Sequence, residues 1–509
     1  MARTTVKFIF KALRTALMLT AAVIAAAGLQ GCNKDNDIIK KEDPKLPVIS
    51  LPQAQQGLTV APGQPILLAP DFLHDDLGDF QVRWYKDGAL VGREEEYIFR
   101  ESAEGSYLMT IEAENRDGTS SLDFTIIVAR GAGYSVTFVP LMFGAPTNDI
   151  TVFSGQTVCL QPVVTGFVNP KYDWEVNGED AGTAPCLNFT PQQAGNYAVT
   201  LQVEEWGLEV AAQTAVHVVA ATEASRMRPA TASSSLFCNK VYEYIPAPGQ
   251  FINEPQELRE VDHAAAISWA EGRLAGRQYV SLGSFGGSLV VGFDHSIPAG
   301  AGTYDFYIEG NSFIGDTGNS NEAGIVWVMQ DANGNGLPDD QWYELAGSEY
   351  GKGSQLRNVA VTYYRPSSPE MPTPWTSSAG ERGELPYLAQ FHSQPYYYPS
   401  WVTADSYTLY GSMLPANYTT VAGNISLNPF DWGYADNWGS DTERRSIDKK
   451  RGPFTGFKIS NARQADGTPV SLRYIDFVKI QSAMLGSRGD IGEASTEVVS
   501  VSDAAIFSN

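Results

Sequence analysis

Several residue types are scarce in this chain of 509 residues, and each scarcity excludes a class of protein. Cysteine occurs 4 times and histidine 5 times, and no two histidines stand at the spacing of metal ligands. This excludes a disulfide-built scaffold and a Cys- or His-rich metal centre. Basic residues number 35 against 58 acidic ones, which gives a net charge of −23. Such a surface repels nucleic acid and anionic lipid head groups, so we expect no nucleic-acid partner.

The motifs of catalysis are also missing. The sequence contains no G-x-S-x-G, H-E-x-x-H, Walker-type or C-x-x-C motif. We therefore expect a binding protein without enzyme activity. A catalytic pair of carboxylates, as in a glycoside hydrolase, stays an alternative because acidic residues are abundant.

The N-terminus predicts secretion and a lipid anchor. Four basic residues precede an apolar run at 16–28 that is too short for a comfortable membrane span. The following LQGC (29–32) resembles the lipobox of bacterial lipoproteins, in which the cysteine becomes the acylated N-terminus. We expect residues 1–31 to be a signal peptide, Cys32 to carry the lipid and residues 32–46 to form a flexible tether.

Two further features concern location. The NKDND that follows Cys32 resembles the surface-export signals of Bacteroidota lipoproteins. No later segment is long and apolar enough to span a membrane. We therefore expect a protein at the cell surface of the outer membrane, held there through its lipid anchor alone.

A pattern of Trp and Tyr occurs twice in the first half of the chain. Trp84 precedes Tyr107 by 23 residues, and Trp174 precedes Tyr197 by the same distance. The surrounding residues alternate between apolar and polar, with turn signals between the runs, as antiparallel strands do. We predict two PKD- or immunoglobulin-like sandwiches, in which the Trp fills the core and the Tyr hydroxyl bonds back to the backbone.

These two sandwiches are expected at 47–130 and 131–221, where they would act as spacers. Cys159 and Cys186 lie in the second one. Outside the cytoplasm such a pair can close a disulfide. Two buried free thiols are the alternative.

The composition changes near residue 228, where glycine and aromatic residues become more frequent. We assign 222–239 to a linker and 240–509 to a larger jelly-roll-like β-sandwich domain with long loops, which makes the whole chain all-β. One segment, 260–274, has the pattern of a helix. The clearest strands are expected at 286–295, 303–310, 322–331, 358–365 and 474–481.

The stretch DANGNGLPDDQWYE (331–344) is dense in oxygen-bearing side chains. Asp331, Asn333 and Asn335 stand at alternate positions before a glycine, the spacing with which calcium loops supply ligands. Trp342 occupies the position of the closing Glu of an EF-hand, so other acids would have to close the site. A tight Asn-Gly hairpin turn is the alternative. The candidate ligands of a structural calcium ion are Asp331, Asn333, Asn335, Asp339, Asp340 and Glu344.

Residues 365–401 are rich in proline and aromatics and show little regular periodicity. A proline-stiffened loop of this kind would offer a ligand a rigid amphipathic platform. His392 is included because imidazole is a common ligand of transition metals. The alternative is that the rings bury against the sandwich. A second aromatic cluster lies at 430–441 and could line the same cleft. The candidate ligand-binding residues of the two segments are Trp375, Tyr387, His392, Tyr396, Tyr397, Tyr398, Trp401, Trp432, Tyr434 and Trp438.

Five segments in the large domain carry a family resemblance. They are PAPGQFINE (246–254), YVSLGSFGGSLVVGFDHSI (279–297), DANGNGLPDDQWYE (331–344), FDWGYADNWGSD (430–441) and YIDFVKIQ…IGEASTEV (474–498). Together they resemble the C-terminal domain of PKD-bearing cell-surface lipoproteins of Bacteroidota, some of which are associated with vitamin B12 (cobalamin) capture beside TonB-dependent transporters.

The resemblance implies a corrinoid as ligand and a TonB-dependent outer-membrane transporter as partner. With such a ligand, the imidazole of His392 would be a candidate ligand of the cobalt. The expected function is therefore capture of a corrinoid at the cell surface and its transfer to that transporter. A glycan-binding lipoprotein is the main alternative, and a glycoside hydrolase or an adhesin are others.

Overall fold

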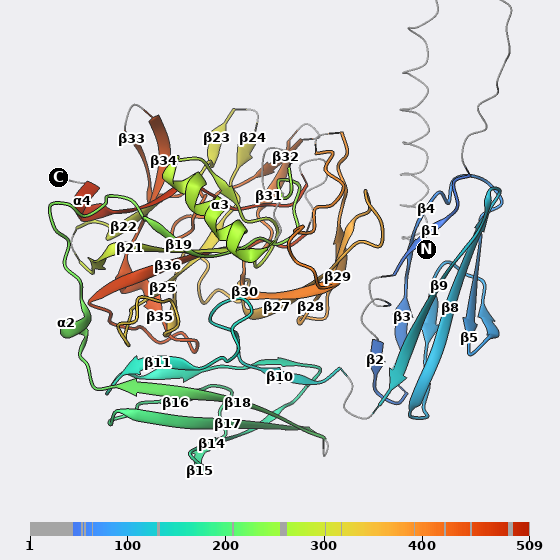
Figure 1. Ribbon diagram of the computed structural model, residues 1–509, viewed down its shortest axis with the longest axis horizontal. Coiled ribbons are helices and arrows are strands. Elements are labelled where there is room, and N and C mark those ends of the chain that lie inside the picture. The colour runs from blue at the N-terminus through green and yellow to red at the C-terminus, as the bar shows by residue number, and fades with distance from the viewer. Residues whose placement is uncertain are drawn as a thin grey trace, which may run out of the picture. The chain divides into compact units, whose positions relative to one another are not determined.

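The computed structural model describes the chain from residue 44 to residue 507, with short gaps. The described ranges are 44–51, 54, 58–63, 65–129, 133–205, 208–254, 262–300, 302–316, 318–390, 392–421, 424–447, 450–486 and 492–507. The expected signal peptide, Cys32 and most of the expected tether lie outside these residues. The described part is nearly all β, and the predicted all-β class is confirmed (Figure 1).

The first sandwich has one five-stranded sheet faced by two short strand pairs, and β2 pairs parallel with β9. In spatial order the sheet contains β2 (Leu58–Val60), β9 (Gly118–Val128), β8 (Gly105–Asn115), β5 (Gln81–Lys86) and β6 (Ala89–Gly92). The pairs are β1 (Val48–Ser50) with β4 (Asp71–Leu73) and β3 (Ile66–Leu68) with β7 (Tyr97–Phe99).

The second sandwich repeats this plan, again with one parallel pair in its sheet. Its sheet contains β11 (Ile150–Phe153), β18 (Leu208–Val219), β17 (Gly195–Glu205), β14 (Lys171–Val176) and β15 (Glu179–Gly182). The pairs are β12 (Val158–Leu160) with β16 (Leu187–Phe189) and β10 (Ser135–Thr137) with β13 (Val163–Thr165).

The repeated aromatic residues play the same part in both sandwiches. Trp84 and Trp174 are fully buried, and each indole N–H donates to a backbone carbonyl ten residues later, at 2.9 and 2.8 Å. The hydroxyls of Tyr107 and Tyr197 donate to the carbonyl four residues earlier, both at 3.0 Å. The prediction that the Trp ring fills the core and that the Tyr hydroxyl bonds back to the backbone is therefore confirmed in both copies.

A tight turn repeats as well. Asp87-Gly88 and Asn177-Gly178 have positive φ at both residues, as a two-residue hairpin turn requires. The side-chain oxygen of Asp87 accepts the backbone N–H of Leu108 at 2.9 Å, and the equivalent bond in the second copy has the same length. The turn is thereby fixed to the strand beside it.

In the second sandwich, a disulfide joins Cys159 to Cys186, with Cα atoms 5.9 Å apart. Cys159 is buried in β12, and Cys186 directly precedes β16, its partner strand. The bond therefore links neighbouring strands on the face opposite the large sheet of that sandwich.

The large domain contains three antiparallel sheets. The first contains β19 (Lys240–Ile245), β21 (Ser288–Pro298), β36 (Tyr474–Ser482), β25 (Gly324–Met329), β26 (Trp342–Leu345) and β35 (Ala462–Arg463). The second contains β33 (Thr442–Ile447), β34 (Lys450–Phe457), β22 (Phe306–Glu309) and β38 (Ser500–Asp503). The third contains β29 (Arg382–Leu385), β28 (Thr373–Ser377), β27 (Leu356–Tyr364) and β30 (Ser406–Met413).

Side chains from all three sheets meet in one hydrophobic core, which gives the sandwich-like packing expected from the sequence. Three short strand pairs complete the domain: β20 (Val280–Ser281) with β37 (Glu497–Val498), β23 (Phe313–Gly315) with β24 (Gly318–Ser320), and β31 (Tyr418–Val421) with β32 (Asn424–Leu427). Each of the five strands predicted most clearly is present.

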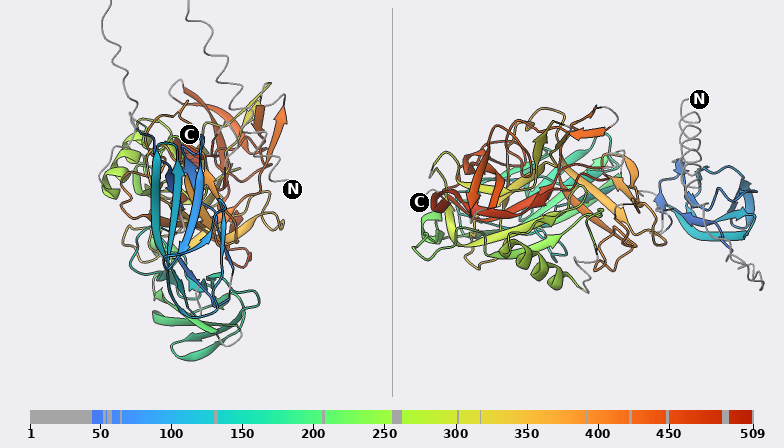
Figure 2. Two further views of the ribbon diagram at one scale, coloured as in Figure 1. Left: turned by 90° about the vertical axis from the view of Figure 1, so that its right-hand side faces the viewer. Right: turned by 90° about the horizontal axis from the view of Figure 1, so that it is seen from above.

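Helices are few among the described residues. The predicted helix is α3 (His263–Ala275), which lies on the outside of the sheets (Figure 2). It begins where the Asp262 carboxylate accepts the N–H of Ala265 at 2.9 Å, and it buries Ala266, Ala270 and Leu274 at four-residue spacing. The short helical segments are α2 (Glu223–Arg226), α4 (Ala504–Phe507) and the 3₁₀ turn Ile459–Asn461.

Removing one corner hydroxyl tests the repeated architecture. In Tyr197→Phe the bond to the Gln193 carbonyl is lost, which should lower local stability by about 1 kcal/mol. Hydrogen exchange of the β17 and β18 amides should then quicken about fivefold. Tyr107→Phe is the reciprocal control, because it should affect β8 and β9 alone. Unchanged exchange in both variants would contradict a stabilising corner.

Candidate ligand-binding surface and calcium loop

The proline-rich aromatic segment folds onto the core. Trp375, Tyr397, Tyr398 and Trp401 are each less than 10% exposed. The hydroxyl of Tyr398 donates to the Ala404 carbonyl at 2.9 Å, so burial leaves no unsatisfied polar tip there. The prediction of an exposed platform is therefore wrong for these four residues. Their rings bury against the sandwich, as the alternative predicted. The segment lacks periodicity because it alternates short strands with turns, not because it stands in solvent.

The other predicted residues of this segment keep partial exposure. The ring of Tyr387 packs against Tyr397 at 5.1 Å between centroids. His392 has its Nδ1 2.5 Å from the Glu254 carboxylate and its ring against Phe251. Tyr396 is half-buried as well. One imidazole nitrogen is thus already engaged by a carboxylate, and the role of His392 toward cobalt stays a prediction.

The second aromatic cluster divides in the same way. Tyr434 is fully buried, and its hydroxyl oxygen accepts the N–H of Glu349 at 2.8 Å. Trp432 and Trp438 are half-buried. The Arg444 guanidinium lies 4.6 Å from the ring centroid of Trp438, within the range of a cation–π contact. Tyr434 is therefore a core residue, whereas the two tryptophans retain surface that a ligand could reach.

Several exposed aromatic and aliphatic side chains of the large domain lie elsewhere, on two neighbouring hairpins. Phe313 and Ile314 on β23 are 51% and 48% exposed, and Tyr418 on β31 is 46% exposed. The hairpins β23–β24 and β31–β32 lie side by side (Figure 1), linked by the Asn319 N–H, which donates to Ser426 Oγ at 2.9 Å. Exposed rings on paired hairpins can contact a ligand or partner.

One amide connects these hairpins to Trp438. Asn321 is buried directly after β24, and its Nδ2 donates to the Leu427 carbonyl at 2.9 Å. Its Oδ1 accepts the N–H of Trp438 at 2.7 Å. The sequence analysis missed this surface, although two large apolar residues inside the turn-rich NSFIGDTGNSN were a signal for it.

The acidic loop is both a hairpin connection and an ordered polar loop. Strands β25 and β26 pair with Met329 opposite Trp342, so the connection is far longer than an Asn-Gly turn. The Asp331 carboxylate accepts three backbone N–H groups, from Gly334 at 2.7 Å, Asn335 at 3.1 Å and Gly336 at 2.9 Å. This carboxylate folds the loop around itself.

Three more predicted ligands converge in this loop. The Nδ2 atoms of Asn333 and Asn335 donate to the two oxygens of Asp339, at 3.0 and 2.8 Å. Both glycines of the loop have a φ of +76°, which places the alternate side chains on one side of a tight curve. Asp331, Asn333, Asn335 and Asp339 are thus the residues that could hold a cation here.

Asp340 and Glu344 accept hydrogen bonds from other groups. Asp340 is buried, and its Oδ2 accepts the Ala332 N–H at 2.9 Å; burial and the charge of Asp339 raise its pKa to about 8. Glu344 lies on β26, where it accepts Gln355 Nε2 at 2.7 Å and Ser412 Oγ at 2.5 Å. The prediction that Glu344 belongs to the loop is therefore wrong, because strand alternation turns it into the domain.

A cavity of about 160 Å³ lies beside β25 and β26, lined by Leu141, Trp327, Trp342, Tyr410 and Lys479 among others. An apolar cavity of this size holds a molecule about as large as one benzene ring. The Lys479 ammonium lies 5.7 Å from the ring centroid of Trp342, and burial lowers the pKa of Lys479. The cavity is therefore too small to enclose a corrinoid or an oligosaccharide.

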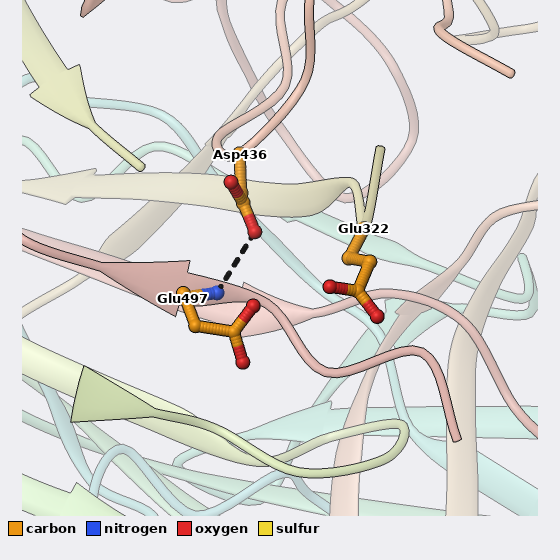
Figure 3. A group of neighbouring side chains, drawn as sticks. All are labelled: Glu322, Asp436 and Glu497. Atoms are coloured by element: carbon orange, nitrogen blue, oxygen red, sulfur yellow. Dashed lines mark hydrogen bonds between the residues drawn. The ribbon is translucent and has the colours of Figure 1, made fainter. Parts of the chain in front are cut away.

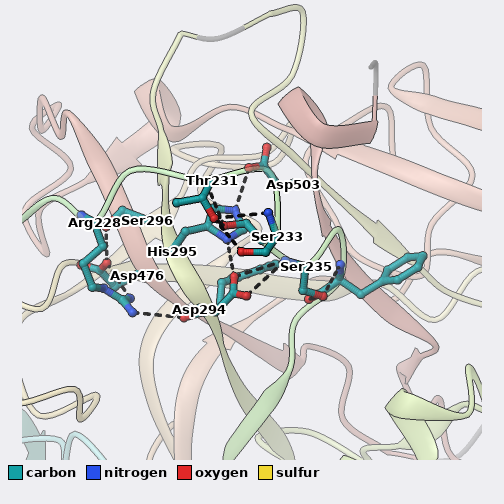
Figure 4. A network of polar contacts seen from close by, with 12 residues as sticks. Arg228, Thr231, Ser233, Ser235, Asp294, His295, Ser296, Asp476 and Asp503 are labelled. Carbon is teal, nitrogen blue, oxygen red and sulfur yellow. Dashed lines mark hydrogen bonds and ion pairs between the residues drawn. The ribbon is translucent and has the colours of Figure 1, made fainter.

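A partly buried polar network attaches residues 228–235 to β21 (Figure 4). His295 lies between two carboxylates, 2.7 Å from Asp294 and 2.9 Å from Asp503. Ser296 donates to Asp476 at 2.6 Å, and Arg228 of the linker donates to the same oxygen at 2.9 Å. Because the serine hydroxyl points to the aspartate and both imidazole nitrogens face carboxylates, this is a structural network without the order of a nucleophilic triad.

Comparison with known proteins identifies one domain. Residues 46–115 match the PKD-like domain family. No curated protein matches the chain. The chain contains a PKD-like domain, which suggests an extracellular or surface protein. Within the described residues, every helix is too short or too polar to cross a membrane.

Several solved structures of tandem β-sandwich modules are similar to part of the chain. They are the fibronectin(III)-like modules of CbhA from Clostridium thermocellum (14% identity, TM-score 0.19, covering 34% of this chain and 94% of that one), the titin domains Z1Z2 in complex with telethonin (17%, 0.14, 35% and 98%) and the four N-terminal Ig domains of a Dscam1 isoform (17%, 0.16, 34% and 45%).

Glu344 gives a pH-dependent prediction. Burial raises its pKa from 4.5 to about 7, so the protonated form favours folding at low pH and this contribution is lost as the pH rises from 4.5 through 7. Relative to Glu344→Gln, the wild-type chain should lose up to about 3 kcal/mol of unfolding free energy across that window. Urea unfolding at pH 5 and pH 8 measures the difference, with exposed Glu381→Gln as control. A difference independent of pH would contradict the assignment.

Proposed function

We propose that this chain is a lipid-anchored binding protein of the cell surface, with Cys32 as its anchor and the large domain as its receptor. The observation that carries a binding role is the exposed apolar surface on the hairpins β23–β24 and β31–β32. Phe313, Ile314 and Tyr418 project there from a domain whose other large rings are mostly buried. Exposed side chains held on hydrogen-bonded hairpins lose less conformational entropy when a ligand covers them than side chains on unpaired loops do.

The proposed ligand is a corrinoid, which the protein would pass to an outer-membrane transporter. Support for this ligand class is the resemblance carried by the five segments of the large domain. The cavity beside β26 is too small for such a ligand, and we place the site on the open hairpin surface, with Trp438 at its border. Half-buried Trp432, Tyr387, Tyr396 and His392 are further candidates at the domain surface.

Binding of cyanocobalamin tests this proposal. Calorimetric titration of the wild-type chain should give a saturable heat, and the double variant Phe313→Ser with Ile314→Ser should weaken binding by at least about tenfold, since two apolar side chains lose their contact. Val168→Ser is the matched control, because Val168 is also highly exposed but lies in the second sandwich.

The alternatives give different results in the same experiment. No heat with cyanocobalamin, together with retardation by a polysaccharide that depends on the hairpin residues, would replace the corrinoid with a glycan. Turnover of a glycoside would identify a hydrolase. If the chain shows no cyanocobalamin binding, no polysaccharide binding and no glycoside turnover, an adhesin-like role remains.

We also propose that the loop at 331–339 binds calcium in a structural role. Asp331, Asn333, Asn335 and Asp339 would supply side-chain oxygens, and the Leu337 carbonyl stands at the position from which such loops add a backbone ligand. The amide nitrogens of the two Asn residues now approach the Asp339 carboxylate, and a rotated amide would present oxygen instead. The proposed ion would stabilise the β25–β26 hairpin without taking part in catalysis.

Local hydrogen exchange tests the calcium loop. At a calcium concentration a hundred times the Kd, exchange of the amides at 334–337 should slow about a hundredfold, because opening the loop releases the ion. Asp331→Asn should abolish that slowing. Asp87→Asn, which alters a similar Asp-to-backbone bond in the first sandwich, should preserve it. Equal exchange rates with calcium and with chelator in the wild-type chain would contradict the site.

A further inference from the structure

Three carboxylates from distant parts of the large domain meet in its interior (Figure 3). Glu322 follows β24, Asp436 lies in the loop 430–441, and Glu497 lies on β37. One oxygen from each lies within 4.8 Å of the others. All three side chains are buried, with exposed fractions of 8%, 0% and 2%. The sequence analysis did not identify this cluster.

Two of the three carboxylates are partly satisfied by backbone N–H groups. Asp436 Oδ1 accepts from Asn311 and Ser312, both at 2.8 Å, and its Oδ2 accepts from the Glu497 backbone at 3.0 Å. Glu322 Oε1 accepts from Ser495 at 3.2 Å. These bonds fix two carboxylates so that they point at a common centre.

Glu497 provides a second and independent observation. Both of its carboxylate oxygens are buried, and neither has a hydrogen-bond partner among the described residues. Its side chain is aimed into the space between Glu322 and Asp436 (Figure 3). A buried acceptor group left entirely without donors costs several kcal/mol, so either a proton shared with a neighbouring carboxyl group or a bound cation must satisfy it.

The electrostatics of the cluster require positive charge. Within the described ranges, no Lys, Arg or His forms an ion pair with any of the three carboxylates. Burial and the neighbouring carboxylates raise the pKa of Glu322 to about 8 and hold the pKa of Glu497 well above its usual value. Either protons or a cation must therefore neutralise the group.

We propose that Glu322, Asp436 and Glu497 bind one divalent cation of the calcium type. Carboxylate oxygens are the ligands that hard divalent cations prefer. Calcium takes oxygens at 2.3–2.6 Å, so a separation of up to 4.8 Å between two oxygens is spanned by a single ion placed between them. The ion would satisfy the unpartnered Glu497 oxygens directly.

The location of the site gives the cation a specific effect. Asn311 and Ser312, which donate to Asp436, directly precede β23, and Glu322 follows β24 shortly after its last residue. Both ends of the hairpin that carries Phe313 and Ile314 are thus attached to the cluster. A bound ion would fix the base of this hairpin and order the exposed surface above it. This inference stands whatever ligand that surface binds.

Calcium binding to the full chain tests the site. The variant Asp331→Asn serves as background, because it removes the separate loop site. A chelator first strips calcium from this chain, and equilibrium dialysis then measures how much added calcium it binds. The background chain should bind one calcium ion, and adding Glu497→Gln should weaken that binding at least a hundredfold. Adding Glu344→Gln is the matched control, since it neutralises a buried carboxyl group outside the cluster and should leave the binding intact.

A local readout keeps the test specific to the hairpin. Calcium should slow hydrogen exchange at 311–322 about a hundredfold at a hundred times the Kd in the background chain, and should have no effect after Glu497→Gln. If circular dichroism shows that Glu497→Gln does not fold, Glu322→Gln takes its place with the same expectations.

Two outcomes would overturn the proposal. No calcium bound by the background chain at millimolar concentration would mean that protons neutralise the cluster. Full binding retained after Glu497→Gln would place the ion elsewhere. Neither outcome depends on cyanocobalamin, so failure of this proposal is distinguishable from failure of the corrinoid proposal.

Discussion

Buried carboxylates that accept backbone N–H groups hold the long connections of the large domain in place. Asp331 folds the β25–β26 connection by accepting three amides, and Asp436 accepts amides from the segment before β23 and from β37. Asp305 joins Gly300 to Ile459 in the same manner, at 2.7 Å to each. A backbone N–H without a strand partner must find another acceptor when it is buried. A carboxylate can serve several such groups at once, which lets loops far apart in the chain pack as closely as strands.

This constraint separates what the sequence could predict from what it could not. The paired Trp and Tyr residues and the alternation of the strands predicted both sandwiches, because each signal is local: the Trp and the Tyr lie 23 residues apart in each copy. The clearest strands of the large domain followed from the same alternation. The carboxylate cluster could not be found in that way. Glu322, Asp436 and Glu497 stand in ordinary polar stretches and meet only after three distant segments are brought together.

For the aromatic residues of 365–401, the sequence predicted a binding surface where the structure has a core. Proline, tyrosine and tryptophan without periodicity indicated an exposed platform, yet Tyr397 and Tyr398 are buried with their hydroxyls bonded to carbonyls. An amphipathic ring is equally suited to a surface and to a core that contains irregular backbone, because the hydroxyl can satisfy a stray carbonyl in either place. Phe313 and Ile314, by contrast, are exposed on a hairpin within a segment rich in Gly and Asn. Burial depends on neighbours that periodicity does not reveal.

The same buried acids change the meaning of the net charge. A value of −23 implies a strongly repelling surface only if every carboxylate is ionised and faces solvent. Burial raises the pKa of Asp340 and Glu322 to about 8 and that of Glu344 and Glu493 to about 7. Near neutral pH these groups are substantially protonated or neutralised by a cation, and they project little field into solvent. The surface is therefore less negative than composition implies. Part of the acidic content organises the interior of the large domain, and exclusion of anionic partners is weaker than the charge count alone suggests.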